Sequence, residues 1–118
     1  MREYAYFDCD MAEKVGILGA VIHYVIDEKI NETIEESIIW YDKNKEYMPS
    51  ELNISNFGAE ISLAFLNVKC RFASSRQIKN SLNELVEKGY LNKSSHSRYY
   101  MPNKKFTDEQ KIKLKIKD

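Results

Sequence analysis

The chain has 118 residues, of which 43% are hydrophobic and 31% are charged. This length and composition favour one small soluble domain and leave little room for a second. Membrane-spanning and secreted classes are disfavoured, because no stretch reaches the roughly 18 apolar residues of a span. The acidic start MREYAYFDCD also lacks the apolar core of a signal peptide. We therefore expect a cytoplasmic protein with no membrane partner.

The formal net charge of zero conceals a strong asymmetry along the chain. Residues 1–60 contain 13 acidic and 5 basic residues, a balance of −8, whereas residues 61–118 contain 5 acidic and 13 basic residues, a balance of +8. A basic half of this kind favours an anionic partner such as nucleic acid. Two solvated faces of opposite charge would give the same counts, so charge alone leaves both interpretations open.

Cysteine usage and motif content argue against a metal site, a redox site and an enzyme. Cys9 and Cys70 stand 61 residues apart, which is neither a ligand nor a redox spacing, and two free thiols are expected rather than a disulfide. The sequence has no glycine-rich phosphate loop, nucleophile motif or Cys/His pairing. We therefore expect no catalysis, no cofactor and no metal.

The first predicted element is a helix over residues 11–29. Asp10, followed three residues later by Glu13, matches a capping arrangement. His23 is interpreted as a core residue rather than a metal ligand. A helix apolar over this much of its surface either lies in the core or also forms a dimer interface. Its two apolar rows are Met11, Val15, Leu18, Ile22 and Val25, and Ile17, Val21 and Tyr24.

Residues 30–50 carry mixed signals. Glu32, Glu35 and Glu36 fit a short helix, whereas SIIWY is rich in strand-forming residues. DKNKE predicts a turn or loop, and Pro49 ends the preceding element.

A second helix is predicted within residues 50–68, with Ser50, Asn53 or Ser55 as its cap. Gly58 would delay its start or bend it, since glycine disfavours a helix interior by about 1 kcal/mol. NVKCRF would then be a short connector. The shared apolar face consists of Ile54, Phe57, Ile61, Ala64 and Phe65.

The third helix, over residues 74–88, has the clearest local signals. Ser74 is the expected N-cap with Gln77 at the capping-box position, and Gly89 suits a left-handed C-terminal residue. Beyond it, YLNK and RYYM are short β-prone runs separated by SSHS, which predicts a hairpin closed by Pro102. The apolar face of the helix consists of Ile78, Leu82, Leu85 and Val86.

Two helices, a short connector and a hairpin predict a winged helix-turn-helix, a mainly α fold with a small β-hairpin wing (α+β). We expect one such domain over residues 1–118, in which residues 102–118 form a C-terminal extension that is helical, extended or frayed. In this architecture the second helix enters the major groove and the wing, residues 90–101, lies along the DNA.

The polar side of the 74–88 helix supplies candidate duplex DNA contacts. Arg76 suits a bidentate contact with guanine, Asn80 or Asn83 suits adenine, and Lys79 suits phosphate. The full candidate set is Lys69, Arg71, Ser75, Arg76, Lys79, Asn80, Asn83, Lys93, His96 and Arg98, with Ser94 beside it on the hairpin.

Two segments also resemble the N-terminal winged-helix domain of Gram-positive phage replication initiators. YFDCDMAEKVGILGAVIHYVI is similar to their FDxDLAEKIGL-like opening, and RQIKNSLNELVEKGYLNKS to their recognition helix and wing. The opening is matched by Phe7, Asp8, Asp10, Ala12, Glu13, Lys14 and Gly16. The later helix is matched by Ile78, Leu82, Leu85, Glu87, Gly89, Tyr90 and Leu91.

The similarity spans roughly residues 6–101. Residues 42–70 depart from the family pattern, and Lys79-Asn80 replaces the usual basic pair. The resemblance implies a phage-type DNA-binding protein, either a transcription regulator or a replication-initiation accessory, in the cytoplasm of a bacterium infected by a phage or carrying a prophage. Because the sequence stops where the larger replication region of that family would begin, we expect a free-standing winged-helix protein.

The alternative is a protein-interaction module, such as an anti-CRISPR-like inhibitor that docks onto a host nucleoprotein complex. Its acidic N-terminal half would present like-signed charge to a nucleic-acid channel. A homodimer and a host or phage protein partner are compatible with these interpretations. The candidate protein-binding residues are Asp27, Glu28, Glu32, Glu35 and Glu36.

Overall fold

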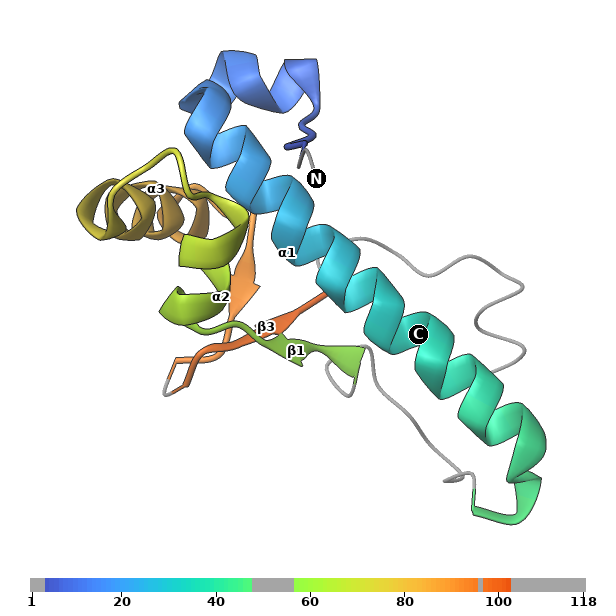
Figure 1. Cartoon of the computed structure of the whole chain (residues 1–118). Helices are drawn as coiled ribbons and strands as arrows, with labels where there is room; N and C mark the ends of the chain where they lie inside the picture. Colours follow the sequence, from blue (N-terminus) through green and yellow to red (C-terminus); the bar gives the residue numbers. More distant parts are fainter. Residues whose placement is uncertain (1–3, 48–56, 96, 103–118) are drawn as a thin grey trace.

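The computed structural model describes residues 4–47, 57–95 and 97–102 of the chain. They form a mainly helical structure with a small antiparallel sheet (Figure 1). The elements in chain order are α1 (Cys9–Lys43), the 3-10 turn η1 (Lys45–Tyr47), β1 (Ala59–Glu60), α2 (Leu63–Lys69), α3 (Ser75–Glu87), β2 (Asn92–Lys93) and β3 (Tyr99–Met101). No helix among the described residues has the length and apolarity needed to cross a membrane.

The helix predicted over residues 11–29 is confirmed, but it is longer at both ends. Asp8, not Asp10, is its N-cap: Asp8 Oδ1 accepts the backbone N–H groups of Asp10 at 2.8 Å and Met11 at 3.2 Å. At the other end α1 continues through SIIWY to Lys43, so the strand considered there is wrong. Glu32, Glu35 and Glu36, predicted on a short separate helix, lie within α1 as well. An apolar row with a period of four residues stabilises this continuation, because it keeps one face of α1 in the core.

Gly16 interrupts α1 with a kink. Its backbone angles, φ 83° and ψ 167°, lie in a region that is essentially restricted to glycine. A Cβ at this position would meet no atom within 4 Å, so the restriction comes from the backbone alone. The kink turns the first helical turns and the preceding N-terminal segment back beside α1 (Figure 1), where the rings of Tyr6 and Tyr24 lie 5.9 Å apart.

The core lies between the inner face of α1, α3 and the sheet. Val21 is buried in it as predicted, whereas Ile17 and Tyr24 are exposed, so the predicted second apolar row does not face the core as a whole. His23 is partly buried. The buried row of α1 consists of Ile22, Ile26, Ile30 and Ile34. From the other elements the core receives Phe57, Ala59, Ile61, Leu66, Cys70, Ile78, Leu85, Leu91 and Tyr100.

The helix predicted within residues 50–68 starts late, as Gly58 suggested, and residues 57–61 are not part of it. Residues 57–59 are buried, and Ala59, Glu60 and Ile61 are then buried, exposed and buried in turn, as in a strand. The helix α2 begins only at Leu63 and uses a different cap, because Ser62 Oγ accepts the N–H of Phe65 at 3.0 Å. The segment called a connector therefore includes the end of α2. Ile54 and the candidate caps Ser50, Asn53 and Ser55 lie outside the described residues.

The predicted hairpin is confirmed, and a third strand that was not predicted joins it. The sheet order is β1-β3-β2, with Ala59 opposite Tyr100 and Lys93 also opposite Tyr100. Gly58 allows this pairing: its N–H donates to the Tyr99 hydroxyl at 2.7 Å, and a Cβ there would lie 2.4 Å from the Tyr100 carbonyl oxygen. β3 ends at Met101, directly before Pro102, and the extension from residue 103 lies outside the described residues.

The two cysteines are free, as predicted, but differ in their surroundings. Cys9 is exposed and Cys70 is buried, and burial raises the pKa of the Cys70 thiol by desolvation. We expect a thiol reagent such as DTNB to label Cys9 rapidly and Cys70 more than about 100-fold more slowly, since Cys70 requires local opening and forms little thiolate. Cys9→Ser should remove only the fast phase of colour release. Two equally fast phases would contradict the burial of Cys70.

Candidate nucleic-acid interface

The helix α3 is fixed at both ends by the predicted local interactions. Ser74 Oγ accepts the N–H of Gln77 at 3.2 Å, and Gln77 Oε1 accepts the N–H of Ser74 at 2.8 Å. Gly89 has φ 78°, and the N–H of Tyr90 donates to the Leu85 carbonyl at 2.9 Å. The capping box and the left-handed glycine are therefore confirmed. Together they set the length of the helix and the point at which the chain turns into the sheet.

The side of α3 turned away from the core carries the polar residues singled out from the sequence. Ile78 and Leu85 are fully buried, and Leu82 and Val86 pack against the core. Exposure on the opposite side is the geometry that a DNA contact requires, while the contact itself stays a prediction. The exposed residues of this side are Ser75, Arg76, Lys79, Asn80 and Asn83.

The connector holds α3 against α2. Leu66 and Cys70 are fully buried, and the N–H of Ala73 donates to the Cys70 carbonyl at 3.0 Å. Ser75 Oγ donates to Asn67 Oδ1 of α2 at 3.2 Å. The Ser75 hydroxyl proton is thus engaged within the protein, which makes Ser75 the weakest of the candidates for reading a base.

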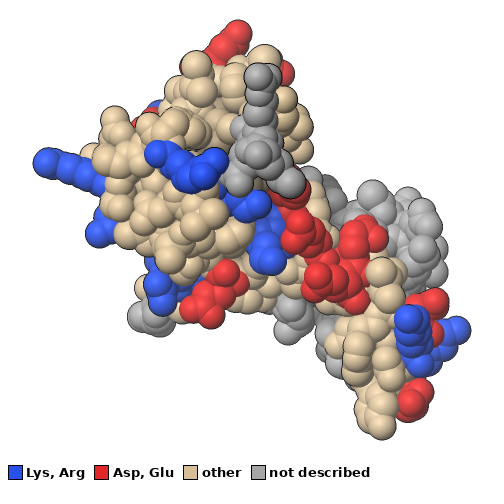
Figure 2. Space-filling model, viewed as in Figure 1, with Lys and Arg blue, Asp and Glu red and all other residues tan. Residues whose placement is uncertain are grey.

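Basic side chains gather over α2, α3 and the hairpin, whereas acidic side chains predominate along α1 (Figure 2). No acidic residue occurs between residues 61 and 83, a stretch with four basic residues. The first acid of α3, Glu84, pairs with Lys88 at 2.6 Å near the end of the helix, and this hydrogen bond raises the pKa of the Lys88 ammonium. The positive potential of α3 is therefore strongest in its first half, which carries Arg76 and Lys79.

The other predicted basic contacts are spread around this half. Lys69 ends α2, Arg71 lies in the connector, and Lys93 lies on β2; all three are exposed. Arg98 precedes β3 and has its Nη2 4.0 Å from Glu60 Oε1, an exposed pair that stabilises little and leaves the guanidinium accessible. His96 lies outside the described residues.

The acidic candidates form a second surface on α1. Asp27 is partly buried, and Lys29 Nζ lies 3.6 Å from Glu32 Oε2. The sequence did not indicate that exposed apolar side chains continue this surface, because their segment was interpreted as a strand. The exposed acids are Glu28, Glu32, Glu35 and Glu36, at steps of four, three and one along the helix. The exposed apolar residues that follow are Ile39, Trp40 and Tyr47.

Comparison with known proteins gives no match: neither a protein-family model, nor a curated protein, nor a solved structure is significantly similar to this chain. The part of the chain that the structure describes also contains no group of three or more His, Cys, Asp or Glu side chains placed to hold a metal ion. The function of the protein is therefore inferred from the geometry and charge of the surfaces described above.

Proposed function

We propose that the chain is a winged helix-turn-helix protein that binds duplex DNA through α3 and the β2–β3 hairpin. The arrangement supports this proposal: α2 and α3 are adjacent helices joined by a short connector, and α3 leads directly into an antiparallel hairpin. In proteins of this class the second helix of the pair lies in the major groove, which is about 12 Å wide and admits one helix.

The observation that carries the proposal is the exposed polar side of α3, opposite a fully buried apolar side. Arg76 is suited to the paired acceptors of guanine, and Asn80 or Asn83 to the donor and acceptor of adenine. Lys79 is suited to a phosphate. The exposed basic side chains around α3 would bind the phosphates of the DNA backbone and fix the position of α3 along the duplex. They are Lys69, Arg71, Lys93 and Arg98.

In this proposal the protein is a phage-type transcription regulator or replication-initiation accessory that acts without catalysis or cofactor. Two copies bound to a palindromic site would place two α3 helices in successive major grooves. Such a protein would work in the cytoplasm of its bacterial host, where the DNA is.

Duplex binding and its salt dependence test the proposal. Five phosphate contacts, from Lys69, Arg71, Lys79, Lys93 and Arg98, predict a slope of about −4.5 in a plot of log K against log salt concentration. Affinity should then fall several hundredfold between about 50 and 200 mM salt, as measured by fluorescence anisotropy. Absence of binding at low salt across a library of genomic fragments would rule the proposal out.

A second candidate function is favoured by the acidic surface of α1 and the exposed apolar residues that continue it. A partner with a basic, nucleic-acid-binding channel would be attracted by Glu28, Glu32, Glu35 and Glu36, and Trp40 would supply an anchor of the kind enriched at interfaces. This is the surface expected of an anti-CRISPR-like inhibitor. Reversing Glu32, Glu35 and Glu36 to lysine separates the two functions: it should abolish inhibition of such a complex, but leave duplex affinity unchanged or improved.

A further inference from the structure

A groove that the sequence did not predict lies between the N-terminal segment and the α2–α3 connector. The groove, which we call the aromatic groove, has a volume of about 460 Å³. It is lined by Tyr4, Ala5, Lys69, Arg71 and Phe72. Two features make it unusual. The rings of Tyr4 and Phe72 are 70% and 63% exposed, and both charged side chains among the described residues that line the groove are cations. Its volume falls within the range of about 300–1,000 Å³ typical of ligand sites.

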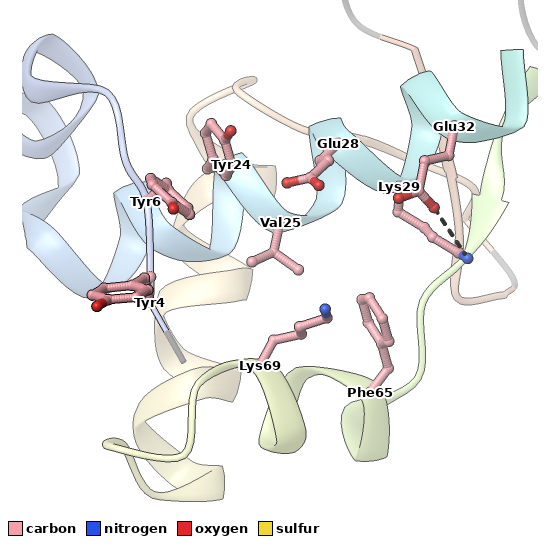
Figure 3. Close-up of a pocket in the computed structure, with 10 residues that line it drawn as sticks. Tyr4, Tyr6, Tyr24, Val25, Glu28, Lys29, Glu32, Phe65 and Lys69 are labelled. Atoms are coloured by element: carbon pink, nitrogen blue, oxygen red, sulfur yellow. Dashed lines mark ion pairs between the residues drawn. The ribbon is translucent and has the colours of Figure 1, made fainter. Parts of the chain in front are cut away.

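A neighbouring cavity of about 290 Å³ shares Tyr4, Ala5 and Lys69 with the aromatic groove. In Figure 3, Lys69 extends from α2 into this cavity, and the acidic side chains lie across from it on α1. Lys69 Nζ lies 5.8 Å from the centre of the Phe65 ring. Glu28 and Glu32 line this neighbouring cavity, whereas the charged residues described in the lining of the aromatic groove are Lys69 and Arg71.

We propose that the aromatic groove binds unpaired nucleotides of single-stranded nucleic acid. The bases would stack on the exposed rings of Tyr4 and Phe72, and the phosphates would lie near Lys69 and Arg71. Exposed aromatic side chains in a basic groove are the two components that single-strand binding requires, and such stacking tolerates any base because every base has a flat face.

The lining favours this ligand over an acidic peptide. Carboxylates would use Lys69 and Arg71 but would leave the ring faces of Tyr4 and Phe72 without a flat partner. Intact duplex DNA would also leave them unused, because its bases are already paired and stacked. The proposal therefore goes beyond duplex binding by α3. It shares Lys69 and Arg71 with the proposed duplex contact, but it depends on the rings of Tyr4 and Phe72, which the duplex contact does not use.

The test measures binding of a fluorescent oligothymidine of about 12 nucleotides, a length matched to single-strand sites of about 4–16 nucleotides, by anisotropy at low salt. Replacing Tyr4 and Phe72 together by alanine should weaken binding at least about 10-fold, because each stacked base contributes about 1–3 kcal/mol by alanine substitution. The matched pair Tyr4→Phe with Phe72→Tyr keeps both rings and should stay within about 2-fold of the wild-type affinity. Lys69→Ala should reduce the salt slope by about 0.7.

Each outcome decides the proposal. No binding of the oligothymidine, unchanged affinity of the alanine pair, or an equal loss in the ring-preserving pair would overturn it. Since both rings are largely exposed, circular dichroism spectra of all variants should match the wild type. Arg76→Ala serves as the converse control: it should weaken duplex binding and leave oligothymidine binding intact. Failure of the groove and failure of the α3 contact are therefore distinguishable.

Discussion

Replacing Arg76 and Lys79 together by alanine should weaken duplex binding by at least about 10-fold. Loss of a bidentate Arg–guanine contact alone costs about 1–3 kcal/mol of discrimination, and loss of a Lys–phosphate contact reduces the salt slope by about 1. Arg76→Ala alone should relax specificity at one base pair, whereas Lys79→Ala should weaken binding to all sequences similarly. Anisotropy titrations against a bound fragment and its single-base variants measure both effects.

A matched control variant separates the effect of direct DNA contacts from the effect of the protein's net charge. Lys43→Ala with Lys45→Ala also removes two positive charges, but from exposed positions at the end of α1 and in η1. This pair should change duplex affinity by no more than about 2-fold, as expected for charges more than a Debye length of about 10 Å from the DNA. Equal losses in the two pairs would mean that net charge alone drives binding, and an unaltered affinity of the α3 pair would remove α3 from the interface.

Ile26→Ala should be a strongly damaging truncation in α1, lowering the free energy of unfolding by about 2–5 kcal/mol. Ile26 is fully buried between α1 and the rest of the core, so its removal leaves a cavity. Ile39, on the same helix, is 57% exposed. Ile39→Ala deletes the same atoms and gains helix propensity, so it should change stability by less than about 0.5 kcal/mol. Urea denaturation monitored by circular dichroism gives both values.

The Ile39 variant also reports on the apolar end of α1. Ile39→Ala could lower the free energy of unfolding about as much as Ile26→Ala, while the urea midpoint rises with protein concentration. That result would mean that Ile39 is covered by a second copy of the chain. Equal and concentration-independent losses in the two variants would instead contradict the exposure of Ile39.

The parts of the fold that the sequence predicted correctly are those whose signals are local. The α3 helix has its capping box at Ser74 and its left-handed glycine at Gly89, and both interactions are closed within a few residues. The hairpin follows from two β-prone runs with polar residues between them. The outward side of α3 follows from the period of its apolar residues, so most candidate residues of that helix could be placed in advance.

The parts that were missed depend on contacts between distant segments. Phe57 and Ile61 are spaced as on one face of a helix. The segment is extended instead because Ala59 pairs with Tyr100 of β3, a residue 41 positions further along the chain. The segment around Trp40 is β-prone, yet the core row of α1 keeps it helical. The aromatic groove unites residues more than 60 positions apart in sequence, Tyr4 and Lys69 among them, and no periodic pattern connects them.

The kink at Gly16 determines where the N-terminal arm lies, and the arm supplies Tyr4 to the aromatic groove. Any other residue type would resist the observed angles and push the arm that carries Tyr4 and Tyr6 towards a different path. The arm reaches the C-terminal end of α3 through Lys14, whose Nζ lies 5.9 Å from the centre of the Tyr90 ring. The hydrogen bonds that end α3 are formed within residues 74–91, so the polar side of α3 should keep its shape. Evolution or an engineer could therefore remodel one of the two proposed nucleic-acid surfaces through a single glycine and leave the polar side of α3 unaltered.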